Sequence, residues 1–219
     1  MKCQICGFKK SLPLFSFPNP RRIGNKRLCY RECLKCGVVY LTPSFSLSNL
    51  DKIYSTQEYF VKLCQPTSNQ ILQKILSLRL FPEYDEFVQS NYHSHNLSLL
   101  DIGCGNGEFL KLMQNRGWKV NGADPSLVAI RNARKLISYK RLKTGKIYNL
   151  KFSQKFDAIT LWHVLEHEPQ PLRLINTLPR LLTNKGKIIL EVPNSDSLLF
   201  RLFKKNYNWL MVPEHIFYY

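Results

Sequence analysis

The stretch LLDIGCGNGEFL, residues 99–110, decides the fold of this chain. It overlaps a short and almost wholly apolar run, LSLLDI (97–102), of the kind that forms a buried parallel strand. The apolar spacing of GEFLKLMQNRG (107–117) predicts a helix, and WKVNGAD (118–124) predicts a second strand. These elements make a βαβ unit. Its glycine turn and the end of its second strand lie at the carboxyl edge of the sheet, where ligands bind.

The glycine spacing indicates what the turn binds. A dinucleotide fingerprint reads G-x-G-x-x-G, whereas here the third glycine, Gly107, comes one residue early. Because there is then no pyrophosphate to neutralise, Asp101 beside the turn is suited to a cationic amino group. Asp124, at the end of the second strand, is placed to accept both hydroxyls of a ribose. The pattern therefore predicts a ligand with a ribose and an amino-acid tail.

The N-terminal cysteines form a repeated pair. CQICG and CLKCG each place two thiolates on one edge of a tetrahedron, and the glycine after the second cysteine permits a tight backbone. Two such turns predict a closed structural zinc site with the ligands Cys3, Cys6, Cys33 and Cys36. Cys29 could compete as a ligand, although it has no paired partner. A redox C-x-x-C is the alternative, but one pair would suffice for it.

Composition bounds the class of protein. With 219 residues, 44% of them hydrophobic, the chain can form one globular domain, or one domain with a small module. No apolar run reaches the roughly 18–20 residues of a membrane span, and the start lacks a signal peptide, so a cytoplasmic location is expected. The 32 Lys and Arg against 15 Asp and Glu give a net charge of +17. That excess favours nucleic acid or an anionic surface, but the cations form no block and could also be solvated faces.

Four motifs in order resemble a known family. LLDIGCGNG, GADPS, FDAITLWHVLEH and GKIILEVPN, within residues 97–194, resemble successive motifs of the class I S-adenosylmethionine (SAM)-dependent methyltransferases. The four-cysteine ribbon and the late PEHIFYY are similar to a bacterial subgroup that carries both. The resemblance implies SAM as the cofactor, contacted by Asp101, Gly103, Cys104, Gly105, Gly107, Asp124 and Pro125.

The resemblance also implies an architecture. The expected fold is α/β, a doubly wound Rossmann-like sheet of strand order 3-2-1-4-5 with a small N-terminal zinc ribbon. The expected domains are the ribbon (1–42), a linker and helical segment (43–95) and the methyltransferase domain (96–219).

The chain departs from the family in two places. Where the family offers an acid near the adenine, residues 143–152 offer Lys146 and Tyr148. The chain also stops at Tyr219, shortly after the expected fifth strand (187–192), so the family's last strands are expected to be missing. An uncovered sheet edge of this kind could pair two copies into a homodimer.

Four side chains are candidates for proton transfer. His163, Glu166 and His167 follow the predicted fourth strand, and His215 lies in PEHIFYY. On a helical turn, His163 and His167 would share one face. Structural roles remain open: Glu166 could cap the next helix, and His167 could hydrogen-bond a loop carbonyl. The order H-x-x-E-H matches an inverted metalloprotease motif, but it follows a strand-like run instead of lying inside a long helix, which argues against that interpretation.

Three functions compete. The favoured one, which the resemblance implies, is SAM-dependent methylation of a small-molecule, sugar or surface-polysaccharide acceptor, on oxygen or carbon. An rRNA or tRNA methyltransferase is favoured by the charge and the ribbon. However, HVLEHEPQP is not the Asn/Asp-Pro-Pro-aromatic loop of base N-methylation, and no stacking platform of aromatic and basic residues is evident. The third is an inactive truncated remnant that only binds the cofactor.

Overall fold

The computed structural model describes residues 2–18, 27–43, 96–207 and 210–219, together with residues 84, 86, 88, 90 and 92. The chain forms two compact units. One comprises Met1–Ile53, Trp162–Asn176 and Glu191–Tyr219, and the other comprises Tyr54–Leu161 and Thr177–Leu190. Most of the predicted linker and helical segment (43–95) lies outside the described residues. The predicted domain boundaries stay predictions.

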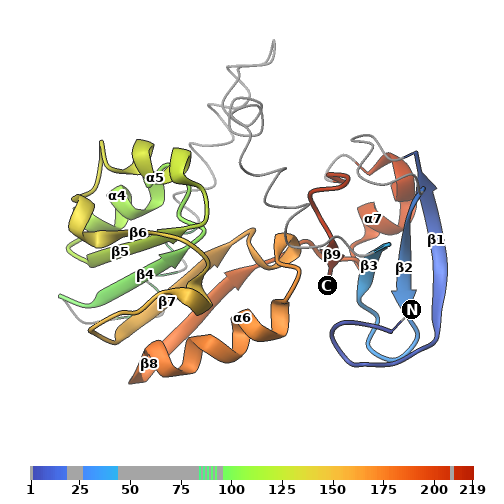
Figure 1. Cartoon of the computed structure of the whole chain (residues 1–219), viewed down its shortest axis with the longest axis horizontal. Helices are drawn as coiled ribbons and strands as arrows, with labels where there is room; N and C mark the ends of the chain where they lie inside the picture. The colour runs from blue at the N-terminus through green and yellow to red at the C-terminus, as the bar shows by residue number, and fades with distance from the viewer. Residues whose placement is uncertain are drawn as a thin grey trace, which may run out of the picture. The chain divides into compact units, whose positions relative to one another are not determined.

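A five-stranded parallel sheet forms the centre of the second unit (Figure 1). Its order is β6-β5-β4-β7-β8, which confirms the predicted order 3-2-1-4-5. The strand pairs β4 with β5, β4 with β7, and β5 with β6 are parallel. The strands are β4 (Ser98–Ile102), β5 (Lys119–Asp124), β6 (Leu142–Thr144), β7 (Phe156–Trp162) and β8 (Leu182–Glu191).

The fifth strand begins earlier than expected. β8 starts at Leu182, whereas the apolar pattern predicted a strand over 187–192. The early residues, LTNKGK, are mostly polar and have no strand-like pattern. The glycine among them explains the close pairing, because a Cβ on Gly186 would lie 2.8 Å from the carbonyl oxygen of Phe156. Among the described strands, β6 and β8 are the edges of the sheet. Pairing of two copies through an edge stays a prediction.

Two helices pack against β5 and β6 on one face of this sheet (Figure 1). The helix α4 (Glu108–Asn115) confirms the predicted amphipathic segment, since it buries Phe109, Leu110 and Met113. The helix α5 (Leu127–Ala133) begins at Ser126, whose hydroxyl accepts a hydrogen bond from the backbone N–H of Ala129 at 3.2 Å. Two further described helices are α6 (Pro171–Thr177) and α7 (Leu198–Phe203).

The first unit contains an antiparallel sheet of order β1-β2-β3-β9. Its strands are β1 (Ser11–Phe17), β2 (Leu28–Cys33), β3 (Val39–Thr42) and β9 (Phe217–Tyr218). β9 was not predicted from the sequence. It pairs Val39 with Tyr218, and the ring of Tyr218 lies 5.4 Å from that of buried Tyr30. The C-terminal residues therefore complete the sheet that the N-terminal residues begin.

In the part of the chain that the structure describes, no helix is long and apolar enough to cross a bilayer.

Candidate functional site

The glycine turn meets an acid at the carboxyl edge of the parallel sheet. Asp124 ends β5, and its Oδ2 accepts a hydrogen bond from the backbone N–H of Gly105 at 3.0 Å. Its Oδ1 accepts another from Ser126 N–H at 2.7 Å. The N–H of Gly103 reaches the carbonyl of Ala123 at 2.7 Å. The structure therefore brings the turn and the acid together, as the βαβ prediction requires.

The turn uses its glycines for different reasons. Gly105 has φ 51°, and a Cβ there would have no atom within 4 Å. A side chain at this position would therefore strain the backbone without meeting a neighbour. Gly107 has φ 80°, and its Cβ would lie 3.0 Å from that of Ala133, so it allows α4 to approach α5. Cys104 is buried, whereas Pro125, after Asp124, is exposed. The open space therefore lies at Gly105.

Asp101 lies inside the sheet. It is 2% exposed, and its Oδ1 accepts a hydrogen bond from the hydroxyl of Thr160, on β7, at 2.7 Å. Burial raises the pKa of Asp101 to about 7 and that of Asp124 to about 6. Both carboxyls thus hold a proton more tightly in the folded chain than in the unfolded one.

This burial predicts that stability falls as the pH rises. Below about pH 4 both states bind the Asp101 proton, and the folded state loses it only near pH 7, so stability is lost across that window. The expected loss from Asp101 is on the order of 4 kcal/mol. Urea unfolding at pH 5 and pH 8 should show a smaller difference for Asp101→Asn, which keeps an oxygen acceptor for Thr160. An equal difference in both proteins contradicts the prediction.

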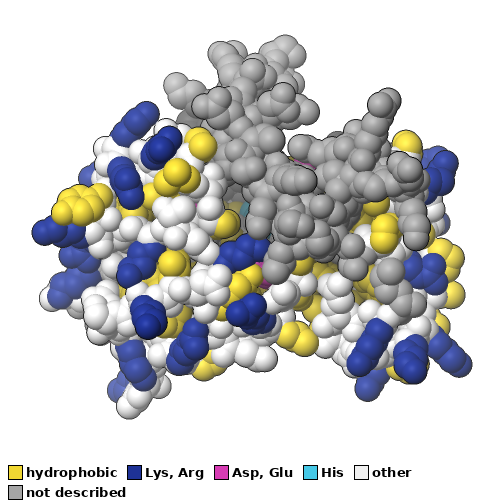
Figure 2. Space-filling view, viewed as in Figure 1, with side chains coloured by type: hydrophobic (Ala, Val, Ile, Leu, Met, Phe, Trp, Pro, Cys, Tyr) yellow, Lys and Arg dark blue, Asp and Glu magenta, His cyan; other side chains and the backbone are white. Residues whose placement is uncertain are grey.

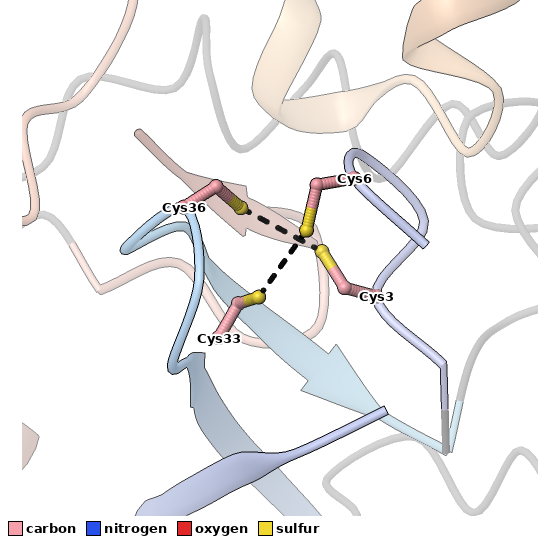
Figure 3. Close-up of side chains that lie close together, drawn as sticks. All are labelled: Cys3, Cys6, Cys33 and Cys36. Carbon is pink, nitrogen blue, oxygen red and sulfur yellow. Dashed lines mark hydrogen bonds between the residues drawn. The ribbon is translucent and has the colours of Figure 1, made fainter. Parts of the chain in front are cut away.

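The four predicted metal ligands lie together in the first unit (Figure 3). The Sγ atoms of Cys3 and Cys36 are 3.8 Å apart, and those of Cys6 and Cys33 are 3.5 Å apart. Two sulfurs bound tetrahedrally to one zinc ion at ~2.3 Å lie about 3.8 Å apart, so the four thiols fit this ion. Cys29 lies outside the cluster, and its Sγ donates to the carbonyl of Tyr30.

Both cysteine turns have the same backbone geometry. The N–H of Gly7 donates to the carbonyl of Cys3 at 3.0 Å, and that of Gly37 donates to Cys33 at 2.9 Å. The two glycines have φ 76° and 74°. The repeated C-x-x-C-G sequence therefore forms two equivalent turns, as its spacing predicted.

His163 is held between two carboxylates. It follows β7 with φ 54°, its Nδ1 lies 3.2 Å from Glu166 Oε1, and its Nε2 lies 3.1 Å from Glu191 Oε1. The hydrogen bond to Glu166, together with the charge of Glu191, raises the pKa of His163. The predicted shared helical face with His167 is wrong, because the 3-10 helix begins only at Leu165.

Glu166, His167 and His215 form a compact cluster in the same unit. The rings of His167 and His215 lie 4.6 Å apart, and Ile216 N–H donates to the carbonyl of Glu166 at 2.8 Å. The hydrogen bond predicted for His167 is confirmed, since its Nδ1 donates to the carbonyl of Glu214 at 2.8 Å. Burial lowers the pKa of His167, and burial with the neighbouring histidines lowers that of His215 to about 3.

The alternative capping role for Glu166 is wrong. Glu166 is completely buried and its Oε1 contacts His163, whereas Glu168 Oε1 accepts the backbone N–H of Gln170 just before α6. Sequence reasoning also missed Glu191 and Glu214. Neither belongs to a motif that signals its role, because both meet their histidines through contacts that are distant in sequence.

Comparisons with known proteins agree with the fold. A family model described as a methyltransferase domain matches residues 72–219. Ubiquinone biosynthesis O-methyltransferase of Alkalilimnicola ehrlichii is 29% identical over 125 residues, covering 53% of this chain and 50% of that protein. The tRNA U34 carboxymethyltransferase of Campylobacter hominis is 31% identical over 131 residues, covering 54% of this chain and 45% of that protein. The chain thus spans about half the length of these curated relatives.

A solved structure extends the comparison. Magnesium protoporphyrin IX methyltransferase from Synechocystis PCC 6803, with bound SAH, superposes with a TM-score of 0.59 at 17% identity. The match covers 73% of this chain and 77% of that one. At this identity the likeness concerns the fold.

Proposed function

Because this chain belongs to the methyltransferase-domain family, we propose that it transfers the methyl group of SAM to an oxygen or carbon atom of a small-molecule, sugar or surface-polysaccharide acceptor. The observation that carries the proposal is the 3.0 Å hydrogen bond from Gly105 N–H to Asp124 Oδ2. It puts a bend with open space beside a carboxylate at one sheet edge, which suits a ligand with a ribose and a methionine tail.

Each cofactor residue then has a role. Asp124 uses one lone pair of each oxygen on the protein's own amides, so the remaining lone pairs are available to the two ribose hydroxyls. Gly105 leaves room for the methionine tail, and Asp101 faces its ammonium group, whose positive charge would favour the ionised form of this carboxyl despite its raised pKa. Gly103, Cys104, Gly107 and Pro125 shape the turn around the ligand.

The reaction needs alignment and a proton acceptor. The methyl carbon forms a bond to the acceptor atom while its bond to the sulfonium breaks, and the electron pair of that bond stays on sulfur. Alignment of donor and acceptor can supply much of the barrier reduction. The acceptor's proton must leave, and Glu166, His167 and His215 are the side chains that we propose handle it. His163, already a donor to two carboxylates, acts as a positioning residue for Glu166.

The four-cysteine cluster is proposed to hold a structural zinc ion. All four positions of a tetrahedral ion are filled by Cys3, Cys6, Cys33 and Cys36, so no position remains for a substrate. The ion would stabilise the two equivalent turns and the sheet that they border.

Replacement of Gly105 tests the cofactor site. Gly105→Ala should weaken SAM binding by about 10-fold or more, because the new methyl group would occupy the space proposed for the methionine tail. Gly117→Ala is the matched control: Gly117 also has positive φ, 89°, and an added Cβ would also have no atom within 4 Å. Both variants should lose ~1 kcal/mol of stability from backbone strain. Calorimetric titration with SAM and thermal unfolding measure the two effects.

The outcomes separate the proposals. If Gly105→Ala and Gly117→Ala bind SAM equally well, the cofactor does not use this turn. If the unmodified protein binds no SAM, both the enzyme and a cofactor-binding remnant are excluded. If it binds SAM but methylates no acceptor of the proposed class, the remnant is favoured.

A tRNA or rRNA acceptor is the second candidate. The net charge of +17 and the resemblance to a tRNA-modifying enzyme favour it. Figure 2 shows Lys and Arg side chains spread over the visible described surface instead of gathered in one patch, which favours the small acceptor. An RNA gel shift that weakens steeply with salt would favour the nucleic acid.

A further inference from the structure

We propose that Glu166, His167 and His215 bind a divalent transition-metal ion such as Zn²⁺, at a second site separate from the four cysteines. Each residue offers one ligand atom, and these atoms all lie within 4.8 Å of one another. Nitrogen and oxygen ligands at ~2.1 Å from one ion lie roughly 3–3.5 Å apart, so small side-chain rotations close the site.

Two buried polar atoms point to a ligand. Glu166 is 0% exposed and His215 is 4% exposed. Glu166 Oε2 and His215 Nδ1 have no hydrogen-bond partner among the residues that the structure describes. A buried carboxylate oxygen without a partner is costly, and a bound cation removes that cost.

The surroundings hold the ligands in metal-binding form. His167 donates its Nδ1–H to the carbonyl of Glu214, which leaves the lone pair on Nε2 and fixes the ring. The second histidine, His215, is held through its backbone. Its carbonyl accepts a hydrogen bond from the hydroxyl of Tyr30 at 2.5 Å, and its N–H donates to the carbonyl of Met211 at 2.7 Å. Support of this kind from a carbonyl and a rigid backbone is typical of metal-binding histidines.

The donor set identifies the kind of ion. Two imidazoles and one carboxylate suit Zn²⁺ and similar first-row ions, whereas Mg²⁺ and Ca²⁺ prefer oxygen ligands. Three protein ligands also leave a coordination position for an exchangeable oxygen, unlike the closed four-cysteine site. An acceptor hydroxyl bound there would lose its proton more readily, so with the ion in place the three side chains would promote proton loss through the metal instead of accepting the proton directly. This last consequence rests on the proposed methyl transfer, while metal binding itself does not.

The first test uses the unmodified chain and Co²⁺ as the probe. The metal-free protein is titrated while its absorption spectrum is recorded. One equivalent should produce the intense near-ultraviolet band of cobalt–thiolate bonds. A second equivalent should bind without increasing that band, since its ligands are nitrogen and oxygen. Saturation at one equivalent overturns the proposal, because the cluster is then an internal hydrogen-bonded network only.

The second test assigns the ligands. Glu166→Gln and His215→Gln keep the size of the cluster but remove a ligand, so each should weaken the second equivalent by roughly 100-fold or more. His163→Gln is the control: His163 lies outside the ligand set, and the glutamine amide can still donate to Glu166, so this variant should retain both equivalents. Circular dichroism verifies folding. Retention of the second equivalent by both ligand variants overturns the assignment.

SAM titration keeps the two proposals apart. A chain that binds the second ion but not SAM retains the metal site and loses the proposed function. A chain that binds SAM but no second ion loses only this inference.

Discussion

Loss of the zinc ion that we propose for the four-cysteine site is expected to unfold the antiparallel sheet of the first unit. Cys33→Ser should achieve this, because Cys33 is buried at the end of β2 and opens one of the two equivalent turns. Structural zinc contributes about 10–16 kcal/mol in zinc-finger peptides at neutral pH, and a whole domain is stable by only ~5–15 kcal/mol. The variant should therefore lose metal and become sensitive to proteolysis within residues 2–43.

The matched control lies on the same strand. Cys29→Ser changes another β2 cysteine whose sulfur is outside the cluster, so it should keep its zinc and its resistance to protease. Metal analysis and limited proteolysis of the two variants measure the difference. A folded, protease-resistant Cys33→Ser protein without zinc would mean that the strands and their aromatic contacts suffice.

Asp124→Asn should have the largest effect on the cofactor. The carboxylate accepts the N–H groups of Gly105 and Ser126, and we propose that it also accepts two ribose hydroxyls. An amide nitrogen in place of one oxygen can accept none of these hydrogen bonds. Loss of one ribose hydrogen bond, together with loss of the charge that strengthens the other, corresponds to about 3 kcal/mol, or roughly 100-fold weaker SAM binding in a calorimetric titration.

Asp157→Asn provides the comparison within the same sheet. Asp157 on β7 also accepts backbone and side-chain hydrogen bonds, from Ser98 and Thr183, but it lies at the amino end of the strands. Its replacement should reduce stability and leave SAM affinity within about 2-fold. If Asp124→Asn and Asp157→Asn weaken SAM binding alike, the effect is one of general stability, and the ribose role is refuted.

Local patterns predicted the elements that short-range chemistry controls. The apolar run before Asp101 and the spacing of Phe109, Leu110 and Met113 gave β4 and α4 almost to the residue. The duplicated C-x-x-C-G gave both turns, because a glycine of positive φ and two thiols form one local unit. The approach of Gly105 to Asp124 followed from the general geometry of a βαβ unit.

Contacts between distant residues were not predictable in this way. β9 has only two residues, which is too short for an alternation of apolar and polar side chains to predict a strand, and it forms by pairing with β3. His163 has a left-handed backbone that a helical spacing rule does not anticipate. The carbonyl of Glu214 that orients His167 lies 47 positions along the chain. The sequence therefore indicated which side chains are candidates for chemistry. It did not indicate which tertiary contacts each of them makes.

The pairing of Val39 with Tyr218 has a consequence for biosynthesis. The ribosome adds roughly 5–20 amino acids per second, so β1, β2 and β3 are made well before β9, the strand that completes their sheet. Until then β3 presents unpaired amide and carbonyl groups along one side, and early binding of the proposed zinc ion by the four cysteines would help to protect these strands from mispairing with other chains.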